Sequence, residues 1–132
     1  MSSQAVDALK KATEGLLYMS ESDEPFEVVS WKGDGSPLDE HKVRQLGGHD
    51  ADTPVKVISL KEFFDPLTQD EDWHGDEEKT TVQQYRSLLA VVQTQLAEAK
   101  VFRLGEVDMT IYVVGQTQDG NWAGLKTTAV ET

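Results

Sequence analysis

The chain has 132 residues, the size of one folded domain, and 38% of them are hydrophobic while 27% are charged. Its 24 acidic and 12 basic residues give a formal net charge of −12, which repels nucleic acids and anionic membranes and attracts basic proteins and cations. The absence of cysteine excludes disulfides, zinc–thiolate sites and thiol nucleophiles. We see no signal peptide and no apolar run of about 18 residues, so we expect a cytoplasmic protein that binds neither nucleic acid nor membrane.

The N-terminal half is predicted to hold two helices and a strand, with an acidic tip between the first helix and the strand. Apolar residues at steps of three and four predict the first helix, which Ser2 or Ser3 can cap. The strand is rich in β-branched and aromatic residues. Ser36 is expected to cap the second helix, and Gly47 and Gly48 to end it. In chain order the elements are a helix over 3–18, an acidic tip over 20–24, a strand over 26–31, a turn over 32–37 and a helix over 37–46.

The C-terminal half is predicted to contain a long helix and a terminal hairpin. One face of the long helix carries apolar residues at steps of three, four and seven. The strand that follows alternates apolar and polar residues, and Asp119 with Gly120 is typical of a tight hairpin turn. Ser59 is expected to cap a brief helix earlier in the chain. In chain order the elements are a strand over 55–58, a helix over 60–64, a long helix over 76–99, an extended segment over 101–104 and strands over 106–115 and 122–130.

This order of elements indicates one α/β domain over residues 1–132, with a mixed sheet covered by helices. No linker and no internal repeat divides the chain. Trp31, at the end of a strand, and Trp122, just after the hairpin turn, are expected to pack in the core.

A dedicated metal site has little support in the sequence. The run 70–76 resembles the opening of an EF-hand loop, with acids at its first and third positions and glycine at its sixth. The twelfth position is Thr81, where a calcium loop needs a bidentate glutamate, so we expect a solvated acidic turn. His41, His49 and His74 lack the spacing of a zinc protease, and we expect surface or capping roles for them.

Catalysis by this chain has no positive support either. The nucleophile motifs of serine hydrolases and the phosphate-binding glycine loop are absent, and there is no cysteine. Paired carboxylates could hydrolyse glycosides, but among 24 acids some pair will always lie near the required distance. We therefore expect that the protein is not an enzyme, and a carboxylate hydrolase ranks last among the alternatives.

The acidic residues gather in two segments that lie beside regular elements, 20–24 and 70–78. Trp73 lies inside the second segment, where a tryptophan is either a local anchor or an interface anchor. If the fold brings these segments and the C-terminal carboxylate together, they form a negative face with a hydrophobic anchor. Carboxylates can take the place of phosphate oxygens against arginine, lysine or a divalent cation, so this face suits a basic, phosphate-binding cleft.

The same residues resemble the nuclease A inhibitor-like family, small acidic proteins of cyanobacteria and other bacteria. The resemblance covers nearly the whole chain and is loosest through 32–54. It implies an inhibitor of sugar-non-specific, metal-dependent endonucleases of the ββα-metal type. It also implies a three-layer α/β/α sandwich like that of pathogenesis-related protein 1. The matching stretches are GLLYMSESDEPFEVVSW at 15–31, EFF at 62–64, DWHGDEE at 72–78, and FRLGEVDMTIYVVGQT, GNWAGLKT and VET within 102–132.

The resemblance also implies roles for individual residues. Glu21 matches a glutamate that contacts the nuclease, and Trp73 matches an interface tryptophan. Thr132 matches a terminal threonine that reaches the catalytic metal ion of the nuclease. Two residues before the tryptophan the family pattern carries an amide, whereas this chain has Glu71. A charge thus replaces a neutral hydrogen-bonding group at this position, where we expect the choice of nuclease to differ.

The expected interface therefore combines acidic residues, one tryptophan and the C-terminus, in a 1:1 complex with the nuclease. The inhibitor needs no cofactor of its own, since the Mg²⁺ or Mn²⁺ belongs to the nuclease and Thr132 binds it only in the complex. The alternative is an acidic interaction module or Ca²⁺-binding module that does not inhibit a nuclease. The expected partner-binding residues are Glu21, Asp23, Glu24, Glu71, Asp72, Trp73 and Thr132.

Overall fold

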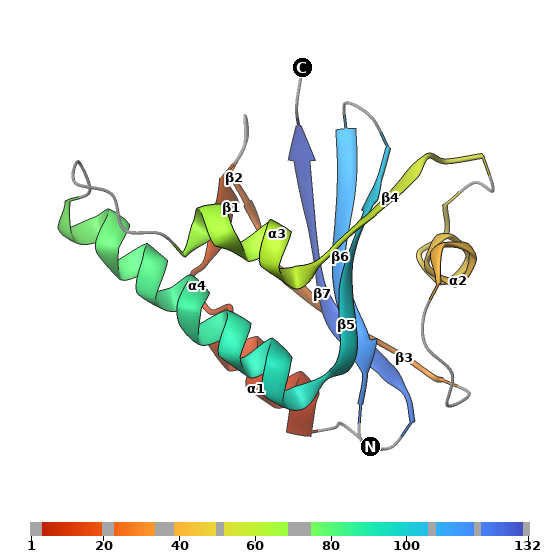
Figure 1. Cartoon of the computed structure of the whole chain (residues 1–132), viewed down its shortest axis with the longest axis horizontal. Helices are drawn as coiled ribbons and strands as arrows, with labels where there is room; N and C mark the ends of the chain where they lie inside the picture. The colour runs from red at the N-terminus through yellow and green to blue at the C-terminus, as the bar shows by residue number, and fades with distance from the viewer. Residues whose placement is uncertain are drawn as a thin grey trace.

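A five-stranded sheet forms the centre of the molecule (Figure 1). The structure is a computed structural model, which describes residues 4–19, 23–33, 39–49, 52–68, 75–105, 108–117 and 120–130. Its strands are β3 (Glu27–Trp31), β4 (Val55–Ile58), β5 (Ala97–Leu104), β6 (Asp108–Gln116) and β7 (Trp122–Val130).

The strand order in this sheet is β3-β7-β6-β5-β4, and each of the four pairings is antiparallel. The prediction of an α/β protein is confirmed, but the prediction of a mixed sheet was wrong. Strands β5, β6 and β7 follow one another directly and pair as hairpins, whereas a parallel pair needs a crossover of a dozen or more residues.

Helices lie on both faces of the sheet. Helices α1 (Gln4–Ala12), α3 (Leu60–Phe64) and α4 (Asp76–Gln95), with the 3₁₀ turn η1 (Asp65–Leu67), lie on one face, and α2 (Glu40–Leu46) lies on the other (Figure 1). Successive side chains of β6 point to opposite faces of the sheet. Ile111 therefore packs in the core beneath α1, α3 and α4, while Tyr112 packs in the core beneath α2. The assignment to a three-layer sandwich of the pathogenesis-related protein 1 type stays a prediction.

The larger core contains the apolar stripe predicted for the long helix. Five residues of that stripe, at successive steps of three and four, are buried, and all but Val82 belong to the larger core cluster. None of the described helices is long and apolar enough to cross a membrane. The buried residues of the stripe are Val82, Tyr85, Leu88 and Val92 in α4 and Leu96 just after it.

The first helix is shorter than predicted. It ends at Ala12 rather than at residue 18, and the hydroxyl of Thr13 donates to the carbonyl oxygen of Leu9 at 2.8 Å. Gly15 then adopts a positive φ of 71°, which reverses the chain direction and ends the helical path. The apolar run that follows forms strand β1 (Leu17–Met19), which pairs with β2 (Asp23–Pro25).

Other element ends differ from the predictions by a few residues. The second helix begins at Glu40, and its cap is Asp39, whose Oδ1 accepts from the backbone N of Lys42 at 2.8 Å; the predicted cap Ser36 lies outside the described residues. The cap at Ser59 is confirmed, since its Oγ accepts from a backbone N–H three residues on at 3.1 Å. The long helix ends at Gln95 rather than Ala99, because strand β5 already begins at Ala97.

Helix α2 is held to the sheet by a small set of contacts. Val43 is its one fully buried apolar residue among the described core residues. The Lys42 ammonium lies 5.1 Å from the centre of the Trp122 ring, a cation–π distance. Just after the helix, Nε2 of His49 lies 2.9 Å from the hydroxyl of Tyr112, and their rings meet edge to face. His49, predicted to be a surface or capping histidine, is therefore partly exposed and also packs against Tyr112.

The buried phenol of Tyr112 should make folding sensitive to high pH. Burial raises the pKa of Tyr112 above its ordinary value of about 10, and the nearby Glu27 carboxylate raises it further. The folded state thus holds this proton more tightly than the unfolded chain. The corresponding stability is complete below about pH 10 and is lost as the pH rises through the raised pKa.

We expect Tyr112→Phe to cost about 1 kcal/mol of stability near neutral pH, because it removes the hydrogen bond with His49. Above about pH 10 the variant should lose stability less steeply than the wild type, because it has no phenol proton to release there. Urea unfolding at a series of pH values measures both effects. Equal losses of stability between about pH 9 and pH 11 in the two proteins would contradict this account.

Gly124 is a site where the packing of the sheet forbids a side chain. A Cβ atom built there would overlap the carbonyl oxygen of Val113 and lie 2.7 Å from the Cα of Val114. Both obstacles are backbone atoms of the neighbouring strand, which cannot turn aside. Gly124→Ala should therefore destabilise the fold by about 3 kcal/mol, as measured by urea unfolding. Thr128→Ala, at an exposed position of the same strand, is the control and should cost less than about 1 kcal/mol.

Candidate partner-binding surface

The acidic tip belongs to a short hairpin. Strands β1 and β2 pair through three Cα partners, from Leu17 opposite Pro25 to Met19 opposite Asp23. The tip was predicted to lie between a helix and a strand, and this was wrong, since strands flank it on both sides. The two residues that flank the connection, Met19 and Asp23, are Cα partners of each other.

The predicted site residues of this segment fall in different parts of the hairpin. Glu21 lies in the connection 20–22, outside the described residues. Asp23 begins β2, and its side chain is not described. Glu24 is the middle residue of β2, opposite Tyr18, and its side chain is partly exposed.

The hairpin is fastened to strand β7. The hydroxyl of Thr127 donates to the carbonyl oxygen of Pro25 at 3.0 Å. Two residues later the chain enters β3, where Glu27 is the Cα partner of Lys126. One side-chain hydrogen bond and one strand pairing therefore fix the base of the hairpin against the last strand of the sheet.

This pairing brings Asp23 and Val130, the described residues next to the acidic connection and next to the C-terminal residues, to the same end of the molecule. Because β3 and β7 are antiparallel, going back from Glu27 to Asp23 follows the same direction as going forward from Lys126 to Val130. Figure 1 shows β1, β2 and the end of β7 together at the top of the view. Thr132 follows two residues after Val130 and lies outside the described residues.

The second acidic segment is fixed at its two ends by helix α4. Glu71, Asp72 and Trp73 lie in the segment 69–74, outside the described residues. Just before that segment, the carbonyl oxygen of Thr68 accepts from Nε of Arg86 at 3.0 Å. Just after it, the carbonyl oxygen of Gly75 accepts from the backbone N of Lys79 at 3.1 Å. Both ends of the segment are thus tied to the first three turns of α4.

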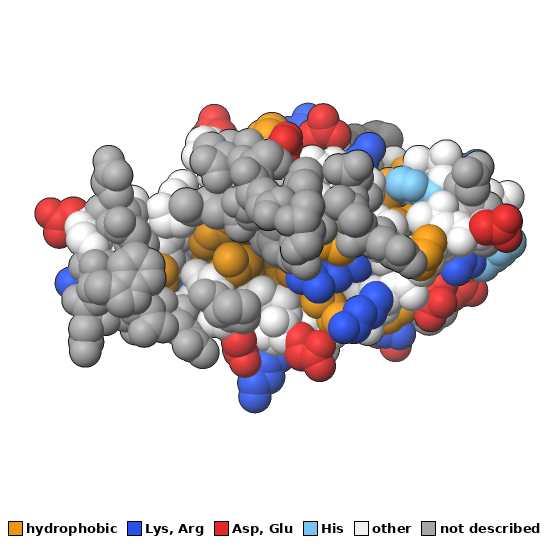
Figure 2. All heavy atoms as spheres, turned by 90° about the horizontal axis from the view of Figure 1, so that it is seen from above, with side chains coloured by type: hydrophobic (Ala, Val, Ile, Leu, Met, Phe, Trp, Pro, Cys, Tyr) orange, Lys and Arg blue, Asp and Glu red, His pale blue; other side chains and the backbone are white. Residues whose placement is uncertain are grey.

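The described neighbours of two of the three predicted contact regions lie together. Strands β1 and β2 contact β7, while the start of α4 is set apart from them on the left of Figure 1. Figure 2 looks onto this end from above and shows acidic side chains around its edge. Hydrophobic atoms and a small group of lysine and arginine atoms lie nearer its middle (Figure 2).

No metal site can be assigned within the described ranges. Among the residues that the structure describes, no group of three or more histidine, aspartate or glutamate side chains gathers to hold an ion. Of the run that resembles an EF-hand opening, only Gly75 and Asp76 are described, so the structure does not test that run.

The sequence contained a signal for the hairpin that the helical pattern obscured. Gly15 interrupts the amphipathic pattern three residues before the expected helix end, and the next residues, Leu17–Met19, are two apolar residues around a tyrosine. Both features are compatible with a helix stop followed by a strand. The hydroxyl of Thr127, which fastens the hairpin, carries no such signal, because its partner is 102 residues away.

Comparison with protein families agrees with the resemblance seen in the sequence. A family model described as nuclease A inhibitor-like protein (NuiA) matches residues 3–132, nearly the whole chain. A comparison with curated protein sequences gives no significant match. The family is one of inhibitors, which agrees with the absence of a catalytic motif in the sequence. The chain belongs to the NuiA family of nuclease A inhibitor-like proteins.

Proposed function

We propose that this protein inhibits a sugar-non-specific, metal-dependent endonuclease of the ββα-metal type by occluding its active site. The observation that carries the proposal is the family match over residues 3–132. The register of β3 and β7 supports it, because the neighbours of Glu21 and of Thr132 lie at one end of the sheet. A carboxylate-rich connection and a chain end that follow these neighbouring strands would be suited to enter a cleft.

Electrostatic attraction brings the two proteins together in this proposal. The net charge of −12 attracts a cleft built to hold polyanionic nucleic acid. Glu21, with Asp23 and Glu24, engages basic groups near the cleft. Because strand pairing fixes the backbone of Asp23 and Glu24 before binding, little conformational entropy of these two residues is lost when the complex forms. Association should slow as salt rises, since added ions screen the attraction.

The second acidic segment adds an apolar contact to the proposed interface. Trp73 supplies a large surface that loses its water on binding, and Asp72 lies beside it in the sequence. Glu71 replaces the amide of the family pattern, so one neutral contact becomes a charged one. This position is where we expect the choice among related nucleases to differ.

The chain terminus completes the block in this proposal. Thr132 reaches the Mg²⁺ or Mn²⁺ of the nuclease and displaces water or phosphate from it. The metal belongs to the nuclease, and the free inhibitor carries no cofactor. The complex is 1:1, and the fold is the three-layer sandwich of pathogenesis-related protein 1. The arrangement of α1, α3 and α4 on one sheet face and α2 on the other supports that fold.

A C-terminal extension tests the role of the terminus. Plasmid cleavage by a ββα-metal nuclease, in excess Mg²⁺, should stop when the native chain is added at a stoichiometric amount. A version with a few residues added after Thr132 should fail to inhibit, because the added residues displace the terminus from the metal. Inhibition by both versions would keep the inhibitor but remove Thr132 from its mechanism. No inhibition by the native chain of the nuclease from the same organism would refute the proposed function.

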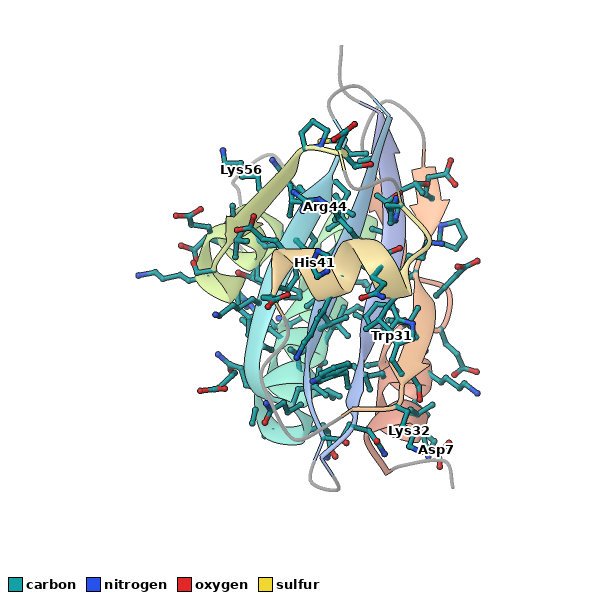
Figure 3. The ribbon with its side chains drawn as sticks, turned by 90° about the vertical axis from the view of Figure 1, so that its right-hand side faces the viewer. Asp7, Trp31, Lys32, His41, Arg44 and Lys56 are labelled. Carbon is teal, nitrogen blue, oxygen red and sulfur yellow. The ribbon has the colours of Figure 1, made fainter. Side chains whose placement is uncertain are left out.

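Alanine variants test the two acidic segments. Glu21→Ala and Trp73→Ala should each weaken the complex by about 2 kcal/mol or more, roughly thirtyfold in Kd, in a titration calorimeter. Asp7→Ala is the matched control, because Asp7 is an exposed acid at the opposite end of the molecule (Figure 3). It should change Kd by less than about threefold. Unchanged affinity in both test variants would show that the site residues are assigned wrongly.

A calcium titration of the isolated protein separates this proposal from the alternative of a Ca²⁺-binding module. If the protein is a nuclease inhibitor, the isolated chain should bind Ca²⁺ only weakly. Tight, saturable Ca²⁺ binding by the free chain would favour the alternative.

A further inference from the structure

A short hinge joins the hairpin of β1 and β2 to the main sheet. The two strands form a sheet of their own, and within the described residues no strand pairing joins them to β7, although both contact it. The chain passes from β2 to β3 through Pro25 and Phe26, because β3 begins at Glu27. The direction in which the hairpin leaves the sheet therefore depends on the backbone of these two residues, the hinge 25–26.

Few rotations are available to this hinge. The ring of Pro25 fixes its own φ at about −65°, and a residue that precedes proline, here Glu24, is restricted to an extended backbone. Phe26 is buried, and its ring meets the Tyr85 ring of α4 edge to face, with 6.3 Å between the ring centres. The peptide group between Pro25 and Phe26 is planar, so its rotation as one unit is the main freedom that remains.

The hydroxyl of Thr127 restrains that rotation. It donates to the carbonyl oxygen of Pro25 at 3.0 Å, and this oxygen lies in the peptide plane of the hinge. Thr127 is buried, and its Cα partner Ile111 belongs to the larger core, so the donor has a fixed position. Pro25 is exposed, so without the hydroxyl a water molecule would bind the same oxygen in many orientations.

We propose that Thr127 is a positioning residue for the nuclease-binding surface, because its hydroxyl fixes the hinge 25–26 and thereby the place of the hairpin beside the end of β7. This inference rests on the proposed function and adds to it a residue that does not touch the nuclease. Rotation at the hinge would change the separation of Asp23 and Val130. These are the described residues next to the proposed contact segments at 20–22 and 131–132.

The size of the effect follows from the equilibrium that the hydrogen bond sets. A hairpin that turns at its hinge spends only part of the time in the orientation that binds, and the apparent affinity falls by that fraction. The net contribution of one neutral hydrogen bond changes such an equilibrium by roughly twofold to tenfold. Loss of the bond should act mainly on the association rate, because fewer molecules have the binding orientation when the nuclease arrives.

The test measures Kd and the association rate for the full chain and the metal-dependent nuclease. Thr127→Val replaces the hydroxyl by a methyl group of similar shape and should weaken the complex about fivefold. Thr127→Ser keeps the hydroxyl and should stay within about twofold of the wild type. Thr128→Val is the matched control, because it makes the same change at the next residue of β7, which is exposed; it should also stay within about twofold. Equal weakening by Thr127→Val and Thr127→Ser would overturn the inference, since the hydroxyl would not be the cause.

Double variants distinguish positioning from a merely structural role. If Thr127 acts through the hairpin, Thr127→Val should have little further effect on Kd once Glu21→Ala has removed the proposed contact of the tip. In the Trp73→Ala background the same change should keep its full effect of about fivefold, because Trp73 belongs to the other acidic segment. An equal penalty in both backgrounds would show a general loss of stability and would refute the positioning role.

Amide hydrogen exchange in the free chain tests the hinge without the nuclease. Exchange in β1 and β2 should be faster in Thr127→Val than in the wild type, because a two-stranded hairpin loosened from its support is only marginally stable. Exchange in β6 should be unchanged, which also shows that the variant is folded. Unchanged exchange throughout the hairpin would mean that the hydroxyl does not hold it, and would overturn the inference.

Failure of the inference can be told apart from failure of the proposed function. If the wild type inhibits the nuclease and Thr127→Val binds equally well, the positioning role is refuted while the inhibitor stands. If the wild type itself does not bind, the proposed function is refuted and the positioning role with it. The exchange rates of the free chain still show in that case whether Thr127 holds the hairpin.

Discussion

The pairing of β3 with β7 is the constraint on which the rest of the structure depends. β3 is reached from the hairpin through Phe26, a buried residue of the larger core, and the register then fixes where the hairpin lies along the last strand. The hydrogen bond from Thr127 to Pro25 adds a second fastening at the same level. Two segments about a hundred residues apart in the chain are thereby joined at one end of the sheet. A different register would move the tip away from the chain terminus and separate the two parts of the proposed inhibitor surface.

The acidic side chains and the packed apolar side chains occupy different regions of this protein. The core is apolar on both faces of the sheet, and the acidic side chains whose burial the structure describes are exposed to water, apart from the partly exposed Glu24. A strongly negative protein repels itself when it folds, and that repulsion is smallest when the charges lie on the outside. Basic residues also reach the surface, as Lys56, exposed on the edge strand β4, shows.

The sequence predicted the elements whose patterns are local and long. The strands at 55–58 and 122–130 and the apolar face of α4 follow from periodicity and turn residues, and their positions agree with the structure. The strand order could not be predicted from the sequence, since it depends on pairings between residues that are distant in the chain. β1 and β2 have three residues each, too few for a periodic signal, and they form because each pairs with the other. Of the predicted site residues, only Asp23 and Glu24 could be located, and the hydrogen bond between Thr127 and Pro25 becomes visible only when the sheet is assembled.

The position of α2 also has an optical consequence. The chain has three tryptophans, and two of them, Trp31 and Trp122, belong to the smaller core under α2, where their emission reports on the packing of that helix. The Trp31 ring lies 5.7 Å from the ring of Tyr112, close enough for the tyrosine to pass its excitation to the tryptophan. The third, Trp73, belongs to the proposed interface. The tryptophan fluorescence of the unlabelled protein thus carries two signals. One reports on the packing of α2 against the sheet, and the other reports on the binding of a partner at the proposed interface.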